Sequence, residues 1–205
     1  VRFDDTILTW AGWDRTVDMR VLHARLLGAD GTAVAVVPEM SVSVSAQALL
    51  NGSLAPRTVE VYRPSLQIVR RADGSFGIGF GGEETSGGDG TAGRILSQFA
   101  GEPDETGSMG YLRRIGIHQA DLVVIDQELG TSWNAPNAEV KLVRGDDGID
   151  ADLSFDLGMP GDRQAHIAML GSYLRETGRT DLGVEFSGVV PAAFAALSTK
   201  LTELA

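Results

Sequence analysis

The sequence contains no cysteine, which excludes a disulfide framework, a thiolate nucleophile and any metal site built from cysteine. Aromatic residues are scarce, at 6% of the chain. No apolar run approaches the roughly 20 residues that a membrane-spanning helix needs. The chain opens at Val1 rather than methionine and shows no signal-peptide pattern, so we expect it to be a segment of a longer protein.

Positive charge is also in short supply. Lysine and arginine together number 17 against 28 aspartates and glutamates, which gives a formal net charge of −11. This balance argues against nucleic acid as a partner and against a basic patch that would bind an anionic membrane. At 43% hydrophobic residues, the chain can still bury a substantial core.

Alternation is the strongest positive signal. Between Asp147 and Leu157, aspartate and serine occupy every second position, and the positions between them are apolar. Met40, Val42 and Val44 alternate with serines in the same way. A period of two residues predicts extended strands with one face kept from water.

The same pattern along the whole chain predicts a mainly β fold. We expect a large curved antiparallel sheet, an open groove of repeated hairpins, with a few short helices and a C-terminal amphipathic helix. The expected strands are 3–10, 17–27, 33–45, 58–62, 66–70, 76–80, 112–118, 121–126, 138–144, 149–157 and 182–186. Residues 164–175 fit a strand or a helix, and the turn at 177–179 favours a hairpin strand. Pro38 predicts a bend or an edge position.

Outside the strands, the sequence predicts short helices at 46–50 and 95–99 and a closing helix at 190–204, where apolar residues recur every three or four positions. Residues 81–93 contain no large apolar side chain and predict a mobile loop.

The chain also repeats parts of itself. Leu8-Thr9-Trp10 is followed by a strand, a turn and a strand, as is Thr131-Ser132-Trp133, and Val59-Glu60-Val61 parallels Ile115-Gly116-Ile117. These similarities predict that residues 1–205 form one segment of a repetitive protein, with sub-repeats at about 1–80 and 110–189.

The residues resemble a known family. Leu8-Thr9-Trp10, the stretch Ala48-Leu49-Leu50-Asn51-Gly52-Ser53-Leu54-Ala55-Pro56 and the segment Arg70-Arg71-Ala72-Asp73-Gly74-Ser75-Phe76 are similar to AsmA-like proteins of Gram-negative envelopes, in particular the YhdP-type branch. Residues 187–194 are similar to that branch too. The resemblance implies a periplasmic protein anchored in the inner membrane, related to bridge-like lipid-transfer proteins, that moves phospholipid toward the outer membrane. It implies no cofactor and no catalytic residue.

Several stretches could indicate other sites. The glycine-rich stretch 77–82 suggests a phosphate loop, but Glu83 and Glu84 follow it where a helix should begin, so a loop is favoured. The three histidines, His23, His118 and His166, have no metal-ligand spacing, and we expect them on strand faces or the surface.

Carboxylates and tryptophans each allow a functional reading and a structural one. Alternation spreads Asp150, Asp152 and Asp156 along a strand, so a solvated face is favoured over a calcium site. Solvent exposure is favoured over calcium binding for the turn residues Asp146 and Asp147 too. The tryptophans Trp10, Trp13 and Trp133 could stack on sugars, but packing is favoured. No metal site is expected.

The apolar face therefore carries the functional hypothesis, namely that it binds phospholipid acyl chains without catalysis. Its predicted members are Val17, Met19, Val21, Met40, Val42, Val44, Val59, Val61, Leu66, Ile68, Ile115, Ile117, Val140, Leu142, Leu153, Phe155, Val184 and Phe186. Two alternatives stay open. The face could be the closed core of a structural or protein-interaction module, whose edges bind adjacent segments. The chain could also be an envelope enzyme acting on glycans, which would need paired carboxylates in a cleft.

Overall fold

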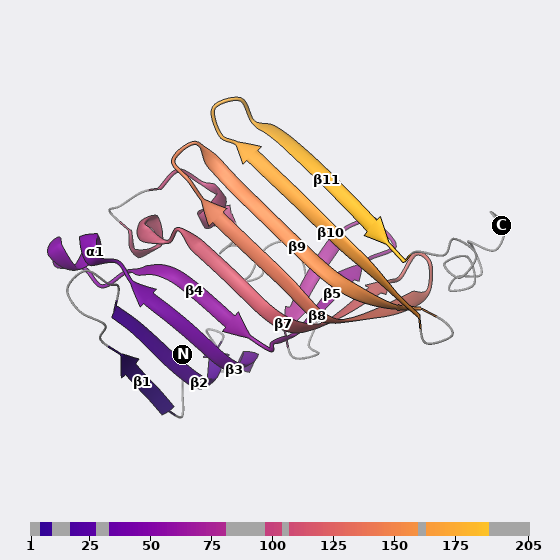
Figure 1. Cartoon of the computed structure of the whole chain (residues 1–205), viewed down its shortest axis with the longest axis horizontal. Helices are drawn as coiled ribbons and strands as arrows, with labels where there is room; N and C mark the ends of the chain where they lie inside the picture. Colours follow the sequence, from indigo (N-terminus) through magenta and orange to yellow (C-terminus); the bar gives the residue numbers. More distant parts are fainter. Residues whose placement is uncertain are drawn as a thin grey trace.

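The computed structural model describes residues 5–9, 17–27, 33–80, 97–103, 107–159 and 163–188 (Figure 1). The strands are β1 (Asp5–Thr9), β2 (Val17–Leu27), β3 (Ala33–Val44), β4 (Pro56–Tyr62), β5 (Ser65–Arg70), β6 (Phe76–Phe80), β7 (Arg114–Asp126), β8 (Thr131–Arg144), β9 (Gly148–Met159), β10 (Arg163–Leu174) and β11 (Arg179–Ser187). Two short helices are α1 (Ala46–Leu50) and the 3₁₀ turn η1 (Ser108–Tyr111), and residues 97–100 form a further helical turn.

One open sheet contains all of these strands. Its main path runs β1-β2-β3-β4-β7-β8-β9-β10-β11, and β5 and β6 branch from β7. All pairings are antiparallel except β4 with β7 and β5 with β7. The predicted fold class, a mainly β chain with a large open sheet and few helices, is confirmed. The predicted loop 81–93 and closing helix 190–204 lie outside the described residues.

Four residues in left-handed conformations lie on one line across the sheet. His23, Arg63, Gln119 and Asn137 have φ angles of 50°, 53°, 53° and 59°. Arg63 and Gln119 occupy equivalent positions, since β4 and β5 both pair with β7 at the same offset. His23 lies opposite Pro38, where the β2–β3 register omits one pair. We call this line the crease. Pro38 lies on the crease, where a bend was predicted. The β3–β4 register ends at Glu39, so Pro38 belongs to the part of β3 that pairs with β2 alone, which agrees with the predicted edge position.

The crease changes which residues face which way. In β7, odd-numbered Ile115 and Ile117 lie on one face, and after Gln119 even-numbered Leu122 takes over that face. In β4 and β5 the positions on this face change in the same way, from odd-numbered Val59 before Arg63 to even-numbered Leu66 after it. One inserted left-handed residue shifts the side-chain alternation by one position, as a β-bulge does. The apolar face therefore stays continuous while the strand bends.

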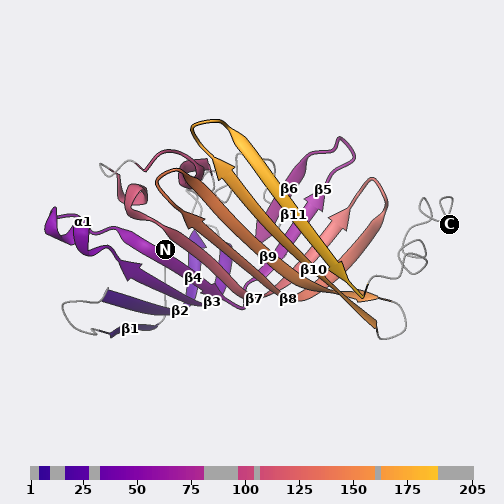
Figure 2. The same cartoon turned by 45° about the horizontal axis from the view of Figure 1, so that its top comes forward.

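The sheet forks beyond the crease. Strand β8 pairs with β9 only through residues 139–144, and its other half pairs with β7 alone, whose opposite edge pairs with β5. Figure 2 shows β5, β6 and this half of β7 and β8 standing behind β9–β11. Side chains fill the angle between the two parts. The buried residues of this core are Ala120, Leu122, Ala135, Ala138, Leu157, Ala165 and Ile167. We call the face that carries these residues the inner face, and the opposite one the outer face.

Candidate functional site

Apolar residues form two continuous rows across the inner face, from β2 to β11. The first row is Met19, Val42, Val59, Ile115, Leu142, Ala151, Gly171 and Leu182. The second row is Val21, Met40, Val61, Ile117, Val140, Leu153, Met169 and Val184. At about 4.8 Å between neighbouring strands, each row is roughly 34 Å long.

The predicted lining residues differ in how far they are covered. Val21 and Val44 are buried, each 4% exposed. Four others are half-buried and pack against the core at the fork: Leu66, Ile68, Ile117 and Phe155. The half-buried remainder is Met19, Met40, Val42, Val59, Val61, Ile115, Val140, Leu142 and Leu153. Val184 and Phe186, on the last strand, are 43% and 61% exposed. The side chain of Val17 lies outside the described residues. Part of the predicted lining is thus ordinary core.

Arg144 closes one end of the inner face. It ends β8 on the inner face, is only 2% exposed, and has no carboxylate partner among the described residues. Its guanidinium donates hydrogen bonds to the backbone carbonyls of Gln98, Phe99, Met109, Gly110 and Leu112. It also lies over the Phe99 ring, 5.0 Å from the centroid. These contacts attach residues 98–99 and 109–112 to the sheet.

No sequence pattern indicates this role for Arg144, because its acceptors are backbone carbonyls. Burial lowers the pKa of Arg144, and the charges of Arg113 and Arg175 lower it further. Arginine stays protonated in proteins, so a charge is buried here. The hydrogen bonds to the backbone carbonyls offset the free-energy cost of removing that charge from water. Arg175 adds bonds to the carbonyls of Ala100, Asp146 and Gly148 at the same end.

Trp133 contributes a polar group to the inner face. It lies on β8 beyond the crease and packs against the core at the fork, which confirms the packing role predicted for it. Its indole nitrogen is buried and has no hydrogen-bond partner among the described residues. A buried donor left unpaired costs about 1–3 kcal/mol. Trp10 and Trp13 lie outside the described residues.

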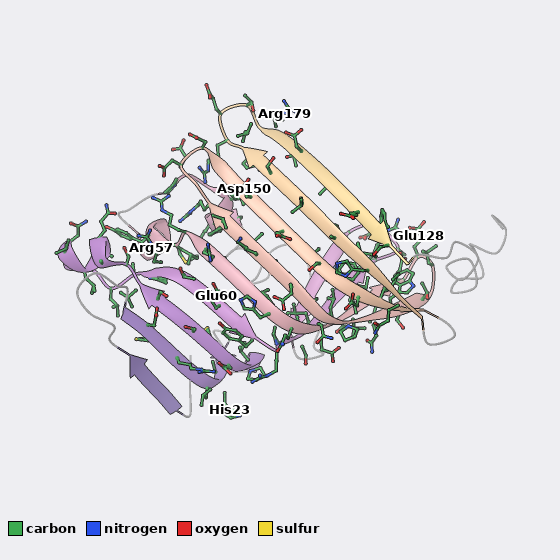
Figure 3. All side chains as sticks on the ribbon, in the orientation of Figure 1. His23, Arg57, Glu60, Glu128, Asp150 and Arg179 are labelled. Atoms are coloured by element: carbon green, nitrogen blue, oxygen red, sulfur yellow. The ribbon has the colours of Figure 1, made fainter. Side chains whose placement is uncertain are left out.

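Polar side chains and ion pairs cover the outer face. Figure 3 shows Glu60 and Asp150 on this side of the sheet. Glu39 pairs with Arg20 and, at 3.3 Å, with Arg63 across neighbouring strands. His166 on β10 lies 2.8 Å from Asp156 on β9. Such exposed pairs each contribute about 0–1 kcal/mol, and they fix strand register more than stability.

His118 joins three strands on the outer face beside the crease. Its Nε2 lies 2.7 Å from Glu60 on β4, and its Nδ1 lies 2.8 Å from Glu139 on β8. Its ring also stacks on Tyr62 at 5.0 Å. Gly116 makes this possible, since a Cβ there would lie 1.7 Å from the Glu60 carboxylate. Both ring nitrogens donate only when His118 is protonated, so neither is available as a catalytic base.

The pKa of His118 follows from these contacts. Burial lowers this pKa, but the hydrogen bonds and charges of Glu60 and Glu139 outweigh burial, and the pKa lies above its usual value of 6.5. The stability that His118 adds is therefore complete below about pH 6.5 and is lost as the pH rises through the raised pKa.

A pH series tests this arrangement. We expect the melting temperature of the wild-type protein to fall more steeply than that of His118→Gln as the pH is raised above about 6.5, because only the wild type loses the two charged hydrogen bonds there. Differential scanning fluorimetry at fixed ionic strength measures both curves. Glu139→Gln, which removes one partner, should give an intermediate slope. Parallel curves for wild type and His118→Gln would show that the cluster adds nothing.

A hollow of about 740 Å³ lies on the outer face. Charged residues of both signs line it, namely Arg114, Lys141, Asp150, Asp152 and Asp181. Val143, Leu170 and Leu182 add apolar surface to this lining, so the hollow is of mixed character. Within the described residues, no three His, Asp or Glu side chains converge to hold a metal ion. Asp150 and Asp152 are exposed on β9, as a solvated face predicts, and Asp156 is half-buried beside His166.

The remaining predicted candidates are dispersed. His23 is exposed at the crease on β2, and two strands, β3 and β4, lie between it and His118 on β7. Gly77 and Gly79 belong to β6, and the rest of the glycine-rich stretch after Phe80 lies outside the described residues. In the described part of the chain, no helix has the length and apolar character needed to cross a bilayer.

Comparison of the chain with protein-family models, with curated protein sequences and with solved structures gives no match. The resemblance to AsmA-like proteins, with the location and transport role that it implies, therefore stays a prediction. Any functional proposal depends on the residues of the inner and outer faces.

Proposed function

We propose that the chain binds the acyl chains of phospholipids on its inner face, without catalysis. The observation that carries this proposal is the pair of continuous rows, whose members from β2 to β9 are half-buried, apart from the buried Val21, and which end in the exposed Leu182 and Val184 on β11. Contiguous apolar side chains that stay partly exposed mark a binding surface. Such a surface favours a ligand that covers it.

Size and energy both suit an acyl chain. The hydrocarbon layer of a bilayer is about 30 Å thick and contains two layers of acyl chains, so one chain of about 15 Å fits within a row of roughly 34 Å. Each methylene removed from water contributes about 0.8 kcal/mol, so about ten sheltered methylenes contribute about 8 kcal/mol before ordering costs. No specific polar contact is needed for this gain.

The wider role rests on the resemblance. In that proposal the chain is one segment of a periplasmic protein anchored in the inner membrane, and lipid passes along its apolar face toward the outer membrane. Hydrophobic contacts do not fix a chain at one place, which suits movement along a lining.

A matched pair of substitutions on β3 tests the proposal. Val42 lies on the inner face and its neighbour Ser41 on the outer face. With a mixture of phosphatidylethanolamine and phosphatidylglycerol, we expect lipid adducts in native mass spectra of the wild type and of Ser41→Glu. We expect at least about tenfold fewer adducts for Val42→Glu, because a carboxylate there must stay hydrated.

Circular dichroism establishes that both variants keep the sheet. If the wild-type protein carries no lipid under these conditions, the proposal fails. Equal loss of adducts in both variants would also contradict it, since it would place the lipid on neither face.

A second candidate is an interaction module whose last strand pairs with another protein. Every residue of β11 is exposed, including Leu182, Val184 and Phe186 at 69%, 43% and 61%. An edge strand with exposed apolar residues is a template for another strand. Absence of lipid together with concentration-dependent association, lost in Val184→Lys, would favour this candidate.

A further inference from the structure

The segment that joins β3 to β4 exposes three large apolar side chains to solvent. Leu49 and Leu50 lie on α1 and Leu54 follows it, and these leucines are 45%, 88% and 72% exposed. The side chain that α1 buries is the small one of Ala48, at 0% exposed. A helix that packs on a sheet normally turns its large apolar side chains toward the core. We call residues 46–54 the tip.

Hydrogen bonds inside this segment pair its backbone groups. The N–H of Ser45 donates to the carbonyl oxygen of Ala55, which joins the two ends of the segment. The N–H groups of Asn51, Gly52 and Ser53 donate to carbonyl oxygens of α1. Backbone groups must be paired within the protein before a segment can enter hydrocarbon. The tip can therefore leave water without leaving these donors unpaired.

The tip also carries no charge. The nearest charged residues along the chain are Glu39 before it and Arg57 after it, although the chain as a whole has a formal net charge of −11. Arg57 is exposed near the start of β4, at the base of the tip. Apolar side chains at the front with a cation behind them form the pattern of elements that lie in a membrane surface.

The small size of the tip favours a bilayer over a protein as its partner. A stable protein interface takes about 20–30 residues from each side. The tip presents three leucines, and a bilayer accepts them without complementary shape. In Figure 1 and Figure 2, α1 projects at one extremity of the sheet, where it can meet a flat surface.

We propose that the tip inserts Leu49, Leu50 and Leu54 into the surface layer of a phospholipid bilayer, with Arg57 at the level of the phosphates. Val44 lies on the inner face between the tip and Val42 of the first apolar row, so this docking holds the β3 part of that row at the membrane. The inference goes beyond the proposed function, because it concerns a bilayer and not a single bound lipid.

Co-sedimentation with phosphatidylcholine vesicles tests the tip. We expect the wild-type protein to bind weakly and reversibly, as a single acyl anchor does. Leu50→Glu should bind at least about tenfold more weakly, the factor that removing one leucine side chain from water supplies. The matched control is Leu170→Glu, since Leu170 is 62% exposed on the outer face of β10, four strands from β4. This control should bind like the wild type.

Two further measurements sharpen the result. Because the chain contains no cysteine, Leu50→Cys takes a single nitrobenzoxadiazole label, whose emission should shift to shorter wavelength when vesicles are added. The same label at Leu170→Cys should not respond. Adding phosphatidylglycerol to the vesicles should weaken binding, since the chain and the lipid are then both negative.

A wild-type protein that stays in solution at millimolar lipid would overturn the inference, as would equal loss of binding in both glutamate variants. Self-association without vesicles, abolished in Leu50→Glu, would overturn it too, because the leucines would then bind a second copy of the chain. Circular dichroism verifies that the variants fold. Lipid adducts in native mass spectra report the proposed function separately, so each proposal can fail without the other.

Discussion

Replacing Arg144 with alanine should lower the free energy of unfolding by about 3–5 kcal/mol. The substitution removes charge-assisted hydrogen bonds to buried carbonyls, of which Leu112 and Phe99 are examples, and leaves those carbonyls without a donor. It also leaves a cavity beside the Phe99 ring, which is only 1% exposed. Urea unfolding followed by circular dichroism measures the change.

The control is Arg179→Ala. Arg179 is also an arginine in an ion pair, with Asp181 at 2.9 Å, but its side chain is 67% exposed. Removing an exposed pair costs about 0–1 kcal/mol. Arg144→Lys keeps the charge but loses the planar fork, so we expect about half of the full effect. If Arg144→Ala cost no more than Arg179→Ala, residues 98–99 and 109–112 would be attached to the sheet by other contacts.

Deleting Gln119 should have an effect of similar or larger size, because it removes the residue that keeps the apolar face continuous. Without Gln119, the side chains in one half of β7 must exchange the two faces of the sheet. Either Leu122 and Val124 leave the inner face, or Ile115 and Ile117 do. Exposing two such side chains costs about 3–6 kcal/mol, and Asp121 would enter the core in exchange. This is comparable to the whole stability of a domain.

Gln119→Gly is the matched control for the deletion. It removes the same side chain but keeps the number of residues, and glycine adopts a φ of 53° without strain. We expect its unfolding midpoint to stay close to that of the wild type, whereas the deletion should show a broad transition and weak near-UV circular dichroism. A deletion variant that unfolds like the wild type would show that the crease does not set the faces.

Much of this fold could be predicted from the sequence, because period-two alternation determines both the strands and their faces. The helix α1 has the bounds predicted for it, since the backbone N–H of Ala48 donates an N-cap hydrogen bond to the Ser45 hydroxyl oxygen. The similarity of Val59-Glu60-Val61 to Ile115-Gly116-Ile117 has a structural counterpart, because Val59 pairs with Ile115 and Val61 with Ile117 in β4 and β7.

Other features could not be inferred from the alternation. The strands predicted at 112–118 and 121–126 are one strand, β7, with the crease between them. A signal is present, since the apolar positions change from odd to even between Val61 and Leu66. The sites of Arg144 and His118 depend on partners 21 to 58 residues away or on backbone carbonyls, and alternation contains no information on either. Trp133 could be placed in the core, but its unpaired N–H depends on three-dimensional packing.

The central claim is that acyl chains lie on the inner face, and photo-crosslinking tests it most directly. A benzophenone side chain would be placed at Val42 or Leu153 on the inner face, and at Ser41 or Asp152 on the outer face of the same strands. After incubation with phosphatidylglycerol and irradiation, mass spectrometry counts the covalent lipid adducts. We predict adducts from Val42 and Leu153 and none above background from Ser41 and Asp152. Adducts of equal yield from both faces, or none from the inner face, would contradict the claim.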